Sequence, residues 1–177
     1  RLGTLWQAAP LINGNTMTTR IDYPADNAFL NSYCSRLSLT NPDPTLAFIS
    51  QAYDRQVKTI AFENIDVQNG KIVSIDPADF VKKILTRQRG GYCYELNGFF
   101  ALLLQPLDIS YPLVACRPLI SPPRRAKTHM AIIANIEGED YLVDTGFGAY
   151  GPRAPIALGK LDTPIAQGPE QFKLSCQ

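Results

Sequence analysis

The hydrophobic period of the chain changes near its middle, and this change limits the fold more than any other feature. Before residue 106, apolar residues recur at helical spacing, and prolines or paired glycines interrupt the runs. After it, short runs are rich in β-branched and aromatic residues. Helices followed by antiparallel strands form an α+β pattern. We predict a helical bundle over 20–106, then an antiparallel, β-rich, barrel-like domain over 107–177, with 1–19 a leader or irregular segment.

Start and stop signals predict four helices in the first half. Aspartate and threonine are good N-caps, and proline fits the first helical position. A glycine pair precedes the last helix and Pro106 ends it. The expected helices follow Asp26, follow Thr45, begin at Asp76-Pro77, and run from Cys93 to Leu104.

The second half is expected to form strands over 111–117, 129–136 and 140–144, with Glu137-Gly138 as a hairpin turn. Residues 145–170 are rich in glycine and proline, which predicts loops and short strands.

A two-residue turn at 137–138 fixes the register of this hairpin. Asp144 then lies opposite Ala131, and His129 is its diagonal neighbour on the same face, roughly 7–8 Å away at the backbone. A different turn would shift this register, and no spacing brings Cys93 to the hairpin. The other face is apolar and suited to a core, which leaves the His129 face for chemistry. Its members are Met130, Ile132, Ala134, Ile136, Tyr141 and Val143.

Charge and hydropathy exclude several classes of partner. The chain has 17 basic and 16 acidic residues, a net charge of +1, so it has no general attraction to nucleic acid or anionic lipid. No apolar run reaches the roughly 18 residues needed to span a bilayer. We therefore predict a soluble, cytoplasmic protein without nucleic-acid or membrane partners. The sequence indicates no oligomeric state.

The cysteines and the single histidine argue against a metal site. Cys34, Cys93, Cys116 and Cys176 form no CxxC pair. A zinc framework normally needs such pairs or several histidines, so we expect no metal and reduced thiols.

The strongest local feature is the segment 89–97, RGGYCYELN, which puts the Cys93 thiol at the start of a helix. A helix N-terminus favours negative charge, here a thiolate, and its free N–H groups can face an oxyanion. The alternative is a buried structural cysteine.

A reactive thiol needs a base, and the base needs an orienting group. His129 and Asp144 fit these roles and would complete a Cys-His-Asp triad. The alternatives are a hydrogen-bonded strand histidine and an aspartate that forms a turn before Gly146. Residues 146–151 also match GxGxxG, but Pro152 and Pro155 argue against the helix that a dinucleotide loop requires.

These motifs together resemble the arylamine N-acetyltransferase family. The matching segments are RGGYCYELNG (89–98), THM (128–130), YLVDTGFG (141–148) and AFENID (61–66). The resemblance runs from Arg20 to Leu158. It implies a helical domain, a β-rich domain and a cysteine-protease-like triad. It also implies a third, lid-like domain, most of which the sequence to Gln177 is expected to lack.

The resemblance further implies ping-pong chemistry. The Cys93 thiolate would take acetyl from the cosubstrate acetyl-CoA and pass it to an arylamine, hydrazine or arylhydroxylamine, as in xenobiotic metabolism. His129 would stabilise the thiolate and remove the amine proton, and Asp144 would orient the ring. The loop at Gly148 would approach coenzyme A.

Several further residues are expected to support this site. Glu63 and Arg89 would form an ion pair, while Phe62, Tyr92 and Tyr94 would either line an aromatic pocket or pack in the core. The alternative functions are a cysteine hydrolase, a transglutaminase-like acyl transferase, or a truncated noncatalytic binding paralogue.

Overall fold

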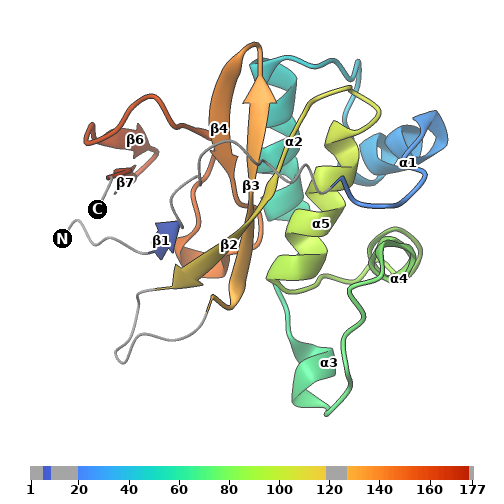
Figure 1. Ribbon diagram of the computed structural model, residues 1–177. Coiled ribbons are helices and arrows are strands. Elements are labelled where there is room, and N and C mark those ends of the chain that lie inside the picture. Colours follow the sequence, from blue (N-terminus) through green and yellow to red (C-terminus); the bar gives the residue numbers. More distant parts are fainter. Residues whose placement is uncertain (1–5, 9–19, 119–126, 176–177) are drawn as a thin grey trace.

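Helix α5 (Cys93–Leu104) lies between a β-sheet and the helices α1 and α4 (Figure 1). The computed structural model describes residues 6–8, 20–118 and 127–175. Within it, α5 packs against strand β3 on one side and against helices α1 and α4 on the other. All its residues except Tyr94 are buried, as expected for a helix that is apolar nearly all round. This helix therefore forms the middle of the main core.

The predicted helix starts are confirmed. Asp26, Thr45 and Asp76 each accept a hydrogen bond from a backbone N–H in the first turn of their helix. A short helix after Asn64 was not predicted. The remaining helices are α1 (Asn27–Leu37), α2 (Leu46–Thr59), α3 (Ile65–Gln68) and α4 (Pro77–Val81), and α4 continues into a π-helical turn, η1 (Lys82–Thr86).

The described strands form an open antiparallel sheet in the order β1-β2-β3-β4-β5, with β6 and β7 as a separate hairpin. The broad α+β class is confirmed, but the expected barrel-like closure is not observed, because β1 and β5 are the two edges and do not pair with each other. The strands are β1 (Trp6–Ala8), β2 (Leu113–Pro118), β3 (His129–Ile136), β4 (Glu139–Val143), β5 (Ile156–Ala157), β6 (Ile165–Gln167) and β7 (Glu170–Phe172).

Strand β1 falls in the segment expected to be a leader or irregular, and it pairs with β2. The other residues of 1–19 lie outside the described residues, as does Cys176.

The predicted hairpin register is confirmed. Ile136 pairs with Glu139 and Ile132 pairs with Val143, so Glu137 and Gly138 form the turn. Both turn residues have positive φ, 54° and 83°, as a type I′ turn requires. The right-handed twist of the strands favours this turn, which fixes which side chains share a face.

The two faces of this hairpin differ from the prediction in one respect. The apolar face packs in the main core as expected, although Met130 on it is only half-buried. The face left for chemistry carries a smaller core, which Ile165 and Phe172 of the β6–β7 hairpin help to cover. The buried members of this second core are Cys116, Ala131, Ile133, Leu142 and Ile156. His129 and Asp144 also lie on this face, at the end of the hairpin that is farthest from the 137–138 turn.

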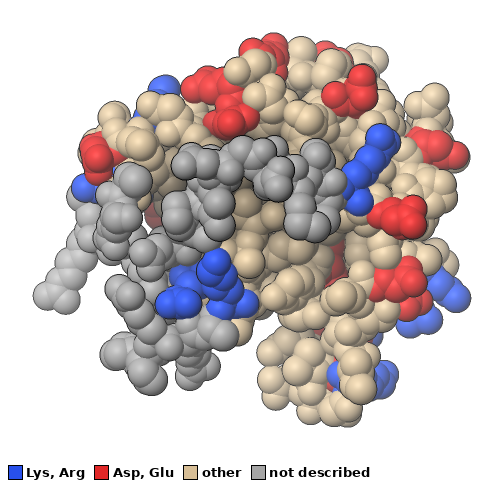
Figure 2. All heavy atoms as spheres, viewed as in Figure 1, with Lys and Arg blue, Asp and Glu red and all other residues tan. Residues whose placement is uncertain are grey.

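The described surface carries both signs of charge. Figure 2 shows acidic and basic side chains interspersed over one face. In the part of the chain that the structure describes, no helix combines the length and apolar character that crossing a bilayer demands.

Gly138→Ala is expected to destabilise the protein by about 1 kcal/mol, because a Cβ at positive φ is strained. Open space surrounds this position, so the effect would report backbone strain alone. Urea unfolding would measure it. Gly138→Asn should lose less, because asparagine tolerates this region. Equal stability of Gly138→Ala and the wild type would contradict the turn geometry.

Candidate functional site

His129 and Asp144 are in direct contact. Nε2 of His129 lies 2.7 Å from Oδ2 of Asp144, and both side chains are buried. His129 is the first residue of β3, and Asp144 directly follows β4. The contact therefore follows from the hairpin register, as the sequence indicated.

Cys93 joins this pair from α5. It is the first residue of that helix and is only 8% exposed. Its Sγ lies 3.9 Å from the carbonyl oxygen of Thr128, the residue before His129, and Cys93 is one of the neighbours that raise the pKa of His129. Because Asp144 occupies Nε2, the other ring nitrogen of His129 is the one available to the thiol. The three residues predicted as a triad are thus brought together.

The contacts of His129 favour its charged form. Burial alone would lower its pKa, but the hydrogen bond with Asp144, the negative charge of Asp144 and the neighbouring Cys93 raise the pKa from 6.5 to about 9. At neutral pH the ring is therefore an imidazolium, which is the partner that a thiolate needs.

The other described cysteines are free and buried. Burial raises the pKa of Cys34, and it raises the pKa of Cys116 to about 12, so both thiols stay protonated near neutral pH. Cys93 is therefore the described thiol that is placed for nucleophilic chemistry.

Gly146 lets the loop after Asp144 approach α5 closely. A Cβ on Gly146 would lie 2.8 Å from Cα of Cys93 and 3.0 Å from its carbonyl oxygen. The backbone N–H of Gly146 also donates to Oδ1 of Asp144 at 3.1 Å. The sequence placed this glycine after a possible turn at Asp144, and its close approach to Cys93 depends on tertiary packing.

Asn97 belongs to the segment 89–97, but no role was predicted for it. It lies one helical turn after Cys93 and donates a 2.9 Å hydrogen bond to Oδ1 of Asp144. Its spacing of four residues puts it on the same helix face as Cys93, and this spacing is the signal that could have identified it.

The predicted ion pair between Glu63 and Arg89 is present, with Nη2 of Arg89 2.7 Å from Oε1 of Glu63. Arg89 also contacts Asp66 at 3.0 Å, and its hydrogen bond is the main cause that lowers the pKa of Asp66 to about 2. Lys83, which the sequence analysis did not identify, lies 3.3 Å from Asp66 and 2.9 Å from Glu95.

This charge cluster, formed by Glu63, Asp66, Lys83, Arg89 and Glu95, supports the start of α5. Glu95 is 2% exposed and accepts a 3.0 Å hydrogen bond from the N–H of Tyr92, which caps the helix. The π-helical turn carries Lys83 to this position, where it is 8% exposed.

The predicted aromatic residues lie outside the buried core. Phe62 is 50% exposed, and its ring lies near Gly148, while Tyr92 and Tyr94 are half-buried with ring centroids 5.5 Å apart. Phe147 meets the His129 ring edge to face at 5.0 Å. Aromatic surface therefore lies beside the imidazole and along the neighbouring loop.

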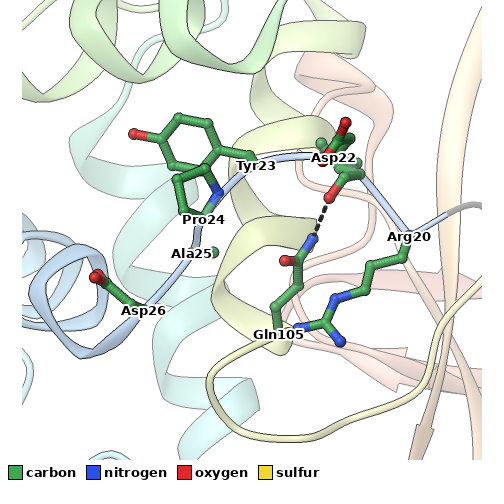
Figure 3. A pocket seen from close by; sticks show the side chains of 8 residues that line it. Arg20, Asp22, Tyr23, Pro24, Ala25, Asp26 and Gln105 are labelled. Carbon is green, nitrogen blue, oxygen red and sulfur yellow. Dashed lines mark hydrogen bonds between the residues drawn. The ribbon is translucent and has the colours of Figure 1, made fainter.

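A hollow of about 380 Å³ lies elsewhere, between residues 20–26 and Gln105 (Figure 3). Gln105 donates to the carbonyl oxygen of Ile21 at 2.9 Å across it. Its lining includes no member of the Cys93 site. Among the described residues, no group of three or more His, Cys, Asp or Glu side chains has a metal-binding arrangement.

Comparison with known proteins agrees with this geometry. Residues 45–177 match the protein-family model described as N-acetyltransferase. A relative from Salmonella typhimurium, described as arylamine N-acetyltransferase / N-hydroxyarylamine O-acetyltransferase, is 31% identical over 134 residues, which cover 74% of this chain and 48% of the relative. An arylamine N-acetyltransferase from Mycobacterium tuberculosis is 33% identical over 137 residues, 73% of this chain and 48% of the relative.

Solved structures agree as well. The arylamine N-acetyltransferase of Mycobacterium marinum in complex with CoA superposes with a TM-score of 0.77 at 32% identity, covering 84% of this chain and 57% of that one. The Salmonella typhimurium enzyme gives a TM-score of 0.76 at 28% identity, with coverage of 85% and 56%. The chain spans about half the length of the curated relatives it matches.

The raised pKa of His129 predicts a pH-dependent stability. A group whose pKa is higher in the folded state stabilises the protein fully below its ordinary value of 6.5, and this contribution is lost as the pH rises through about 9. The free energy of unfolding should therefore fall across this window, by at most about 1.4 kcal/mol per pH unit for one group. Urea unfolding at a series of pH values would measure the fall, and His129→Gln should flatten it. An equally steep fall in the variant would contradict the assignment.

Gly146→Ala is expected to push the loop away from α5, because the new Cβ would overlap backbone atoms of Cys93. We expect a loss of about 1–3 kcal/mol in stability and slower alkylation of Cys93. Gly159→Ala is the control, since a Cβ there meets only a Glu139 side-chain oxygen at 3.4 Å. Wild-type stability and alkylation in Gly146→Ala would show that the close approach is not required.

Proposed function

Because the chain belongs to the arylamine N-acetyltransferase family, we propose that Cys93, His129 and Asp144 form a catalytic triad that moves an acetyl group from acetyl-CoA to an arylamine. The observation that carries this proposal is the buried 2.7 Å contact between His129 and Asp144, with the Cys93 sulfur 3.9 Å from the carbonyl oxygen of the residue before His129. These residues would supply a nucleophile, a base and an orienting group.

In the first half-reaction, the Cys93 thiolate attacks the carbonyl carbon of the acetyl thioester. The bond between that carbon and the CoA sulfur breaks, and the departing CoA thiolate takes a proton from the His129 imidazolium. The acetyl group then remains on Cys93 as a thioester, and His129 is neutral.

In the second half-reaction, the amine nitrogen attacks the acetyl-Cys93 carbonyl carbon. Neutral His129 accepts the proton that the nitrogen loses, and the Cys93 thiolate leaves. The cycle ends with the imidazolium and thiolate restored. Asp144 orients the ring and stabilises its charged form throughout, without taking the proton.

The start of α5 would stabilise the oxyanion that forms in both steps. The first backbone N–H groups of a helix have no partner within the helix, and Cys93 is at this position. The charge cluster and the Tyr92 cap would hold these donors in place.

Aromatic acceptors fit the surface beside the thiol. Phe147 and Tyr150 belong to the loop 146–150, the Phe62 ring lies near Gly148, and Phe62 and Tyr150 are largely exposed. Arylamines would stack on such rings, and hydrazines and arylhydroxylamines present a nucleophilic nitrogen or oxygen to the same thioester. The Salmonella typhimurium relative is named both an arylamine N-acetyltransferase and an N-hydroxyarylamine O-acetyltransferase.

Acetyl-CoA would approach along the bend at Gly148. This glycine has a φ of 79° and is exposed, and a Cβ at this position would lie 3.6 Å from the Phe62 ring. A solved relative that superposes over most of this chain was obtained in complex with CoA, which supports this cosubstrate.

Intact-mass measurement would test the proposal. Mixing the protein with acetyl-CoA should add the mass of one acetyl group, and adding an aromatic amine should remove it and yield the acetylated amine. Cys93→Ala should form no adduct. His129→Gln should slow adduct formation by about 10²-fold or more, because proton transfer and the ion pair are both lost.

The outcomes separate the alternatives. Acetate released without an amine would indicate a hydrolase. Folded wild-type protein that forms no adduct would contradict the transferase assignment for this chain and would favour a noncatalytic binding role.

A further inference from the structure

We propose that Asn97 is a positioning residue that holds the thiol helix, the histidine strand and the aspartate loop in one arrangement. The inference rests on the proposed function, because it concerns the same triad. In this role Asn97 acts through Asp144 and through the packing of α5 on β3, and not by contact with the reacting sulfur.

The side-chain amide of Asn97 uses all of its hydrogen-bonding capacity. Its nitrogen donates to the carbonyl oxygen of Met130 at 2.6 Å and to Oδ1 of Asp144 at 2.9 Å. Its oxygen accepts from the N–H and the hydroxyl of Thr145 at 2.8 and 3.0 Å. The side chain is fully buried.

These partners belong to the elements that carry the triad. Asn97 itself lies on α5 with Cys93, Met130 follows His129 on β3, and Thr145 follows Asp144. One side chain therefore links all three elements at positions adjacent to the proposed catalytic residues, or one helical turn from them.

The network also fixes which way the amide points. Reversing it would turn its oxygen toward the Met130 carbonyl and the Asp144 carboxylate, and its nitrogen toward the donor N–H of Thr145. Three of the four contacts would then pair like with like, and only the Thr145 hydroxyl could adapt by accepting. The donor is thus held against Asp144.

The donor determines the rotation of the Asp144 carboxylate. Oδ2 faces His129, and Oδ1 receives Asn97 and the N–H of Gly146. Because Gly146 belongs to the same loop as Asp144, it cannot set the position of the loop relative to α5. Asn97 is the α5 residue whose side chain reaches Asp144 itself, and a contact of the Thr145 hydroxyl with the Leu96 carbonyl oxygen at 3.3 Å also joins the loop to this helix.

Gln56 provides a matched control. It is also a buried amide, 1% exposed, on α2. Its nitrogen donates to the carbonyl oxygen of Leu96 and to the Thr145 hydroxyl, both at 2.9 Å, and its oxygen accepts from Tyr33 at 2.7 Å. It shares Thr145 with Asn97, but its hydrogen bonds go to Tyr33, Leu96 and Thr145 and not to the Asp144 side chain.

The test compares Asn97→Leu and Gln56→Met, both apolar and of similar size to the residue replaced. Iodoacetamide alkylation of Cys93, followed by mass spectrometry across neutral and alkaline pH, measures thiolate reactivity without acetyl-CoA. We expect both variants to lower the urea midpoint by similar amounts. Asn97→Leu should slow alkylation at neutral pH about tenfold or more, whereas Gln56→Met should stay within about twofold.

If Asn97→Leu does not fold, Asn97→Asp tests the positioning role instead. It keeps the size of the side chain and the acceptor for Thr145, but places an oxygen against Asp144. As the pH falls, a proton shared by the two carboxylates restores a donor. The ratio of its alkylation rate to that of the wild type should therefore rise on acidification, whereas a purely structural defect would give a flat ratio.

Equal alkylation profiles of Asn97→Leu and Gln56→Met, or a flat ratio for Asn97→Asp, would overturn the proposal. Because alkylation needs no acetyl-CoA, these results are independent of whether the wild type forms an acetyl adduct. Failure of the proposed function is therefore distinguishable from failure of this inference.

Discussion

Asp144 carries a carboxylate that is only 1% exposed, and the need to satisfy that buried group governs its surroundings. A buried charge without partners is strongly destabilising, so each oxygen must receive donors. His129 of β3, Asn97 of α5 and the N–H of Gly146 supply them. Since these donors come from a strand, a helix and a loop, satisfying one carboxylate brings three elements to the same point.

The start of α5 also contains a buried carboxylate, and there the partner is a side chain of opposite charge. Glu95 is buried, and it is paired with Lys83 and bonded to the backbone of Tyr92. Lys83 in turn approaches Asp66, which Arg89 also contacts. Buried ion pairs are weak evidence of net stability, but losing one partner is costly. The cluster is therefore better understood as fixing the turn before Cys93 than as stabilising the fold as a whole.

Local signals were enough to predict much of the fold. Asp26, Thr45 and Asp76 cap helices through neighbours within three residues, and the Glu137-Gly138 turn sets the hairpin register that places His129 beside Asp144. Each of these inferences needs only short-range geometry.

The features that escaped prediction depend on packing between distant segments. No spacing rule brings Cys93 to the hairpin, because this contact depends on how one side of the apolar helix α5 docks on β3. The same docking gives Asn97 its partners. From the sequence, Lys83 would be expected to face solvent, but the π-helical turn directs it inward. The second core depends on the β6–β7 hairpin, which covers the sheet.

The register of the β3–β4 hairpin restricts how the chain length can vary here. Because both faces of these strands are buried, a slip by one residue would carry Asp144 into the main core and bring Val143 to the polar site. A change in chain length is therefore tolerable only at the 137–138 tip. Added residues can bulge out there and leave the pairing of the strands intact. Length variation between homologous chains should accumulate at that tip, about a strand's length from the thiol, and be absent between His129 and Ile136.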